Sequence, residues 1–121
     1  MKKTFLTLLV MFSAVCGLYA NSYEDAQFEE YVQRTRKDMT KMAGASMSSD
    51  NKYRIIYLAL TVNAPKSNFA NVQAVKNAMV AEMRKNVQEV KVVKQLKITF
   101  VYTFMTSDKY AVCIPISYKE F

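Results

Sequence analysis

Histidine is missing from the whole 121-residue sequence. Without it the chain cannot build a Ser-His-Asp or Cys-His catalytic centre, and it lacks the commonest zinc ligand. The two cysteines and two glycines also argue against a thiolate metal site and against a glycine-rich loop that cradles phosphate. We therefore expect a protein that is not an enzyme and that carries no metal or other cofactor.

Carboxylate pairs are equally uninformative about catalysis. They occur as Glu24-Asp25 and Glu29-Glu30, both in one predicted helix. Neighbours in a helix point apart, so these pairs indicate a solvated face rather than the two facing acids of a glycosidase. A hydrolase that works without histidine remains the least favoured of the possible functions.

The first twenty residues have the layout of a secretory signal peptide. Two lysines precede an apolar run over 5–15, and small residues then lead to Ala20. The run is shorter than the roughly 20 residues that a membrane span needs. Lipidation of Cys16 competes with cleavage after Ala20, but Ser13 and Val15 depart from the lipoprotein pattern.

We therefore predict a signal peptide over residues 1–20 and a single domain over 21–121. The predicted location is the periplasm of a Gram-negative bacterium or the exterior of the cell. Contact with a membrane is expected only through the leader, if Cys16 is lipidated or the leader is retained.

Positive charge dominates the second half of the chain. The net charge is +7, and residues 51–121 hold 11 basic but 4 acidic residues. Such a half could face an acidic protein or an anionic component of the envelope, although solvated lysines are the plainer interpretation. Export and the lack of an arginine-rich cluster argue against nucleic acid. The candidate contact residues are Arg84, Lys85, Lys91, Lys94, Lys97, Tyr102 and Tyr110.

The spacing of apolar residues predicts an α+β fold in the order helix, strand, helix, strand, strand. Two helices would cover one face of a small sheet in a two-layer sandwich, with the first two strands parallel and the last two in an antiparallel hairpin. Residues 87–96 fit either a helix or a strand. The predicted elements are a helix over 21–44 with a Ser22–Asp25 capping box, a loop over 45–51, a strand over 52–62, a helix over 67–86 and strands over 97–105 and 110–118.

The predicted hairpin has a defined register. A three-residue loop over 107–109 sets Phe104 opposite Val112, so that the bulky residues of both strands share one face, which is expected to turn toward the helices. This loop needs a left-handed residue, for which Asp108 suits best. Pro115 cannot donate to a ladder and predicts an edge strand or a bulge, and the apolar run around Cys113 predicts a buried thiol.

These observations favour an exported, non-catalytic binding or protein-interaction domain. An immunity or inhibitor protein that blocks a toxin or hydrolase is one version of it. The alternative is a carrier that holds a small apolar ligand or lipid between sheet and helices. Eight tyrosines could line such a cleft, or could pack in the core with their hydroxyl groups at its rim.

Overall fold

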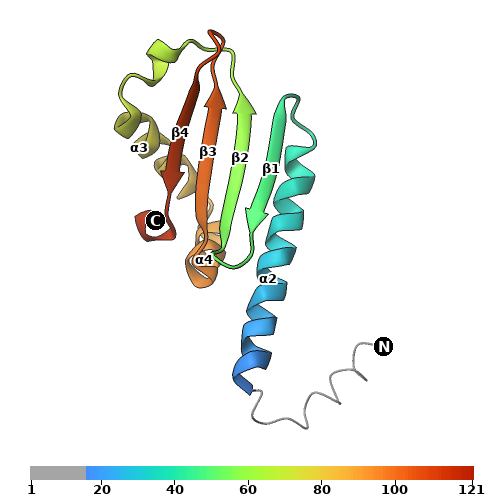
Figure 1. Ribbon diagram of the computed structural model, residues 1–121. Helices are drawn as coiled ribbons and strands as arrows, with labels where there is room; N and C mark the ends of the chain where they lie inside the picture. Colours follow the sequence, from blue (N-terminus) through green and yellow to red (C-terminus); the bar gives the residue numbers. More distant parts are fainter. Residues whose placement is uncertain (1–15) are drawn as a thin grey trace.

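The computed structural model describes residues 16–121, which form a mixed α+β fold (Figure 1). The predicted leader lies largely outside this range. None of the helices in the described part has the length and hydropathy to cross a membrane. In chain order the elements are α2 (Cys16–Met39), β1 (Ala45–Asp50), β2 (Ile55–Thr61), the short 3-10 helix η2 (Lys66–Phe69), α3 (Val72–Met83), α4 (Val87–Leu96), β3 (Thr99–Met105), β4 (Ala111–Ile116) and the 3-10 turn η3 (Tyr118–Glu120).

The sheet has the order β1-β2-β3-β4. The two outer pairs are antiparallel, whereas the central pair β2 and β3 is parallel, as predicted. The connection between these parallel strands contains α3 and α4, which lie behind the sheet in Figure 1. A parallel pair needs such a long crossover, because the chain must return to the end of the sheet where the first strand began before the second strand can start.

The predicted element order is wrong in two places. Residues 45–50, expected as a loop, form the edge strand β1, and the ambiguous residues 87–96 form the helix α4. β1 is held by backbone pairing with β2 rather than by strongly strand-forming side chains. Asn86 does not end the preceding helix in a left-handed turn; its side chain accepts the N–H of Glu89 and caps α4.

The helix boundaries also differ from prediction. α2 begins at Cys16, so Ser22 lies inside it and the expected N-terminal cap at Ser22 is wrong. α2 ends at Met39 rather than at Gly44, which has a left-handed φ of 75° just before β1. The predicted helix over 67–86 begins at Val72, after the cap residue Asn71.

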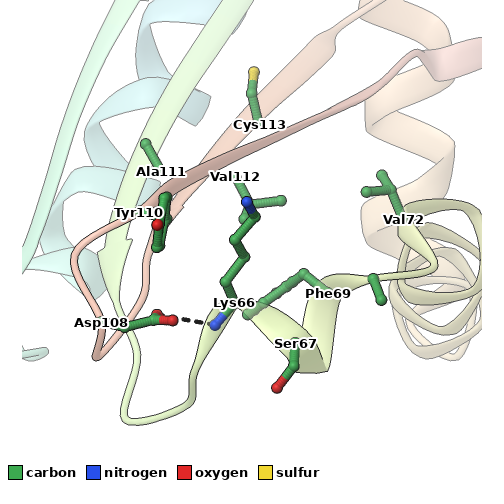
Figure 2. A pocket seen from close by; sticks show the side chains of 10 residues that line it. Lys66, Ser67, Phe69, Val72, Asp108, Tyr110, Ala111, Val112 and Cys113 are labelled. Atoms are coloured by element: carbon green, nitrogen blue, oxygen red, sulfur yellow. Dashed lines mark hydrogen bonds between the residues drawn. The ribbon is translucent and has the colours of Figure 1, made fainter.

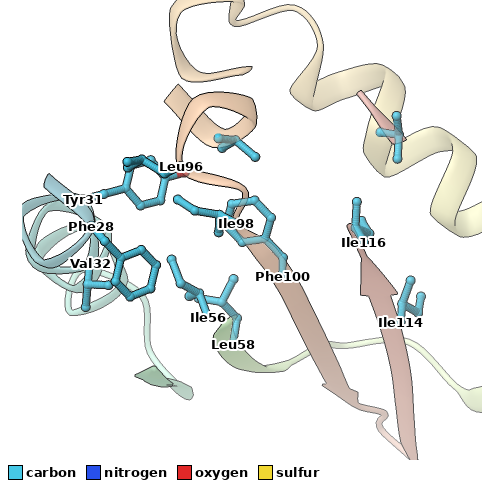
Figure 3. Packing of buried hydrophobic residues seen from close by; sticks show 12 residues of the cluster. Phe28, Tyr31, Val32, Ile56, Leu58, Leu96, Ile98, Phe100, Ile114 and Ile116 are labelled. Carbon is cyan, nitrogen blue, oxygen red and sulfur yellow. The ribbon is translucent and has the colours of Figure 1, made fainter. Parts of the chain in front are cut away.

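The hydrophobic core lies between the helices and one face of the sheet. Figure 3 shows α2 contributing Phe28, Tyr31 and Val32 opposite side chains from β2 and β3. Alternate residues of each strand reach the core because successive side chains point to opposite faces. The buried strand and helix residues that complete it are Ile56, Leu58, Val80, Val93, Leu96, Ile98, Phe100, Ile114 and Ile116.

The predicted hairpin register is confirmed: Phe104 lies opposite Val112, and Tyr102 lies opposite Ile114. The left-handed residue of the loop is Lys109, with φ 69°, and not Asp108 as predicted. The Asp108 carboxylate is instead used as a hydrogen-bond acceptor, as described below. The prediction of a buried Cys113 is wrong, because Cys113 is exposed on the sheet face that the helices leave open.

Candidate functional site

The outer edge of β4 carries unpaired backbone groups. The N–H of Thr106 donates to the carbonyl of Tyr110 at 2.8 Å, which makes these two residues a hydrogen-bonded pair. Bonded and non-bonded pairs alternate along an antiparallel ladder. The odd-numbered residues Ala111, Cys113 and Pro115 therefore turn their backbone groups to the free edge. Pro115 has no N–H to leave unpaired there, which explains how the strand accommodates a proline, and the predicted edge position is confirmed.

The opposite edge of the sheet, at β1, is partly closed by a side chain. The N–H of Thr61 donates to the carbonyl of Gly44 at 3.2 Å, so the same alternation directs the Met47 carbonyl outward. The guanidinium group of Arg36, on α2, donates to that carbonyl at 3.4 Å. Natural sheets commonly protect an edge in this way, and the contrast leaves β4 as the more accessible edge.

A groove of about 680 Å³ lies beside the N-terminal half of β4. Its second wall is the segment that carries η2 and leads into α3, with Phe69 and Val72 facing the strand (Figure 2). Val112 points into the groove from β4, while the Cys113 thiol points away from it. Most of the lining is therefore apolar, and an exposed strand edge runs along one side of it.

The two walls of the groove are tied together through Asp108, in the β3–β4 loop. Its carboxylate accepts the backbone N–H of Lys66 at 2.9 Å and the hydroxyl of the buried Thr106 at 2.6 Å. The N–H of Ser107 also donates to the carbonyl of Ala64 at 2.8 Å. The Thr106 hydroxyl, followed by the Lys66 N–H, holds the pKa of Asp108 below its ordinary value, so the carboxylate is ionised at neutral pH.

One cation stands at the end of the groove. The ammonium group of Lys66 lies 4.3 Å from the centroid of the Tyr110 ring, a cation–π contact. The ion pairs found among the described residues do not include Lys66. The Asp108 carboxylate lines the same groove, and the Lys66 charge contributes to lowering its pKa, so a carboxylate of a bound molecule would share Lys66 with Asp108.

Tyr102, a predicted contact residue, belongs to the core instead. It stands in a row of aromatic rings along the helix side of β3, between Phe100 and Phe104, with centroid separations of 6.1 and 6.0 Å. Tyr31 continues the row and donates its hydroxyl hydrogen to the carboxylate of Glu89. Burial, with a smaller contribution from Glu89, raises the pKa of Tyr102 to about 12. Burial and then the hydrogen bond to Glu89 raise the pKa of Tyr31. Both tyrosines remain neutral at physiological pH.

The predicted basic residues are not gathered around the groove. Lys91 and Lys94 are exposed on α4 and Lys97 follows it, at the end of the sheet opposite to the β3–β4 loop (Figure 1). Arg84 donates to the carbonyl of Glu120 at 2.7 Å, and Lys85 forms an exposed ion pair with Glu82 at 3.2 Å. Of the seven predicted contact residues, Tyr110 alone lines the groove.

Sequence reasoning missed the other groove residues, above all Lys66, Phe69 and Asp108. Phe69 was expected inside the predicted helix over 67–86, and the loop over 107–109 was predicted only in its turn geometry. The one signal that pointed to this region was Pro115, which indicated the free edge.

Residues 16–121 contain no group of three acidic or cysteine side chains placed to hold a metal ion. Comparisons of the chain with models of protein families, with curated proteins and with solved structures found no match. The geometry of the groove and the strand edge is therefore the basis for assigning a function.

Proposed function

We propose that this protein is an exported, non-catalytic interaction domain that binds an extended segment of a partner protein along β4. The observation that carries the proposal is the coincidence of the groove with the free backbone groups of Ala111 and Cys113. An extended peptide added to a sheet edge gains affinity from main-chain hydrogen bonds and specificity from pockets for alternate side chains.

The geometry specifies what the segment should look like. Side chains that point to the helix side would enter the space between Phe69, Val72 and Val112, which suits an apolar residue. A carboxylate near the Tyr110 end would meet the ammonium group of Lys66, which shares the groove with the Asp108 carboxylate. On this proposal the acidic character of the partner is expected at one position, and the lysines of α4 are not required.

Panning a phage-displayed library of random dodecapeptides against the immobilised protein tests the proposal. Enriched peptides should be extended, with apolar residues at alternate positions and an acidic residue at one end. Their affinity should fall about 5- to 10-fold for Ala111→Pro, which removes one outward N–H without breaking a bond to β3.

The matched control is Ala111→Ser, which keeps the N–H and changes the side chain by one hydroxyl group. It should bind like the original protein. Unchanged affinity of Ala111→Pro, with its circular dichroism intact, would contradict strand addition. Failure to enrich any peptide above background would contradict peptide binding altogether.

A small apolar ligand or lipid remains the second candidate function. The groove volume of about 680 Å³ lies within the range of small-molecule sites, and its lining is mainly apolar. This space lies beside β4, however, and not between sheet and helices, where the carrier hypothesis placed it. Mass spectrometry of lipid extracted from the purified protein separates the two functions, because a stoichiometric lipid supports the carrier.

We infer export from the predicted signal peptide, and a measurement of the intact mass tests it separately from the binding function. The intact mass of the protein purified from its native envelope should correspond to a chain that begins at Asn21. A lipid-modified Cys16 terminus would replace the periplasmic assignment with a membrane-anchored one.

A further inference from the structure

The sheet face that points away from the helices is nearly free of charge. Charged residues make up 22% of the chain, yet the strand positions on this face hold one, Asp50, at a corner of the sheet. The Asp50 carboxylate accepts the N–H groups of Lys52 and Tyr53 in the β1–β2 turn, at 2.9 and 3.1 Å. Its position and these bonds keep it out of the centre of the face.

The centre of this open face is lined by short side chains. Ser46, Ala59, Thr103 and Cys113 form one row across all four strands, and Tyr57 and Val101 stand in the adjacent row. Cys113, Ser46 and Tyr57 are exposed, and the other three are partly exposed. Apart from the larger side chains of Tyr57 and Met105, the short side chains leave a face on which a second sheet can pack at the usual distance of about 10 Å.

Charge distinguishes among the possible occupants of the face. An acidic protein or an anionic membrane would be drawn to lysines, and the strand residues on this face offer none. A second copy of the chain carries the same positive net charge and is repelled by the rest of the surface. Between two copies of the neutral face this repulsion is smallest, and a self-complementary patch is what a two-fold dimer requires.

The area of the open face determines how tightly two copies are expected to associate. Four strands of six or seven residues cover about 400 Å² on each copy, so a pair buries about 1,000 Å² once the corrugation of the surface is included. This is the lower limit for a specific interface.

We propose that the open sheet faces of two copies pack against each other in a weak, two-fold symmetric dimer. Ala111 and Cys113 of β4 belong both to the lining of the groove and to this face, so a bound peptide and a second copy would meet along β4.

Sedimentation velocity of the purified protein over a series of concentrations tests the dimer. The original protein should shift from monomer to dimer, and Thr103→Lys, at the centre of the face, should weaken the dimer about tenfold or more by burying an unpaired charge. Gln88→Lys adds the same charge at an exposed position on α4 and should leave the equilibrium unchanged. Tyr57→Lys provides a second disruption at a residue that is 41% exposed, in case Thr103→Lys fails to fold.

The Cys113 thiol supplies an independent readout. Its labelling by a maleimide should slow as the protein concentration rises, and this dependence should be lost in Thr103→Lys. A protein that stays monomeric at every concentration overturns the proposal, as does a dimer that both lysine variants leave intact. If the Cys113 thiol is protected from labelling in envelope extract but not in the concentrated pure protein, a different protein covers the face. That result also overturns the dimer proposal.

Discussion

The backbone N–H of Lys66 donates a hydrogen bond of 2.9 Å to the carboxylate of Asp108, 42 residues further along the chain. This bond fixes the β3–β4 loop against the segment that forms the second wall of the groove. The same carboxylate satisfies the hydroxyl of Thr106, a polar side chain that is 4% exposed. One acidic side chain therefore determines both the shape of a loop without glycine and the width of the groove.

Replacing Asp108 by alanine should lower the melting temperature by a few degrees at neutral pH. Because the pKa of Asp108 is lowered in the folded protein, its contribution is complete above the ordinary value of 3.8 and is lost as the pH falls through the lower folded value. The melting temperatures of the original protein and Asp108→Ala should therefore converge in acid. Asp38→Ala, at an exposed position on α2, is the control. If the melting temperatures of Asp108→Ala and the original protein differ by the same amount at every pH, the ionised Asp108 carboxylate does not have this stabilising role.

Tyr31→Phe should lower the free energy of unfolding by about 1–3 kcal/mol, because the Glu89 carboxylate loses its partly buried donor. The raised pKa of Tyr31 means that the neutral hydroxyl is stabilised by folding. Stability should be complete below the unfolded value of 10.0 and should decline as the pH rises above it.

Urea titrations between neutral and alkaline pH measure this decline. It should be shallower in Tyr31→Phe than in the original protein. Tyr53→Phe, at a ring that is 64% exposed, should leave it unchanged. An equally steep decline in Tyr31→Phe would show that other groups cause the alkaline loss.

Ile114→Ala and Cys113→Ala compare adjacent residues on opposite faces of β4. Ile114 is fully buried, so its truncation should cost about 2–5 kcal/mol. Cys113 is exposed, so its replacement should change the free energy of unfolding by about 0.5 kcal/mol or less in dilute solution. Urea denaturation measures both, and comparable losses would place Cys113 in the core after all.

Lys97→Gly should stabilise the protein by up to about 1 kcal/mol, because Lys97 follows α4 with a left-handed φ of 56° that glycine adopts without strain. Lys94→Gly, three residues earlier and inside the helix, should instead destabilise it by about 1 kcal/mol. The two variants lose the same charge and differ only in backbone position. Thermal melts that shift in the same direction for both would contradict this account.

The hairpin was predictable because burial imposes a period of two on both strands. Shifting the register by one residue would move Phe104 away from Val112 and separate the two bulky faces, so the pattern of side chains left one solution. The identity of the left-handed loop residue was not predictable in this way. It depends on the hydrogen bonds that Asp108 makes to Lys66 and Thr106, one of them across 42 residues.

The groove was only partly accessible from the sequence. Pro115 indicated a free strand edge, and the structure has that edge at β4. The second wall comes from residues 66–72, most of which were expected to begin the helix over 67–86. These residues form the short 3-10 helix η2 instead, and α3 begins only after Asn71, whose side chain accepts the N–H of Ala74.

The exposure of Cys113 and the burial of Ile114 have two causes, the local sequence pattern and the tertiary packing. The alternation of a strand places these neighbours on opposite faces, and that much follows from the order of the residues. The bulkier side chains lie on the face of Ile114, so the order also predicted that this face would turn toward the helices, and the core confirms it. Whether the face of Cys113 would be covered as well was decided only by the tertiary structure. The helices dock on the face of Ile114, because α2, α3 and α4 bury their own apolar stripes against the larger side chains there. Cys113 is exposed because no helix in residues 16–121 packs on the other side.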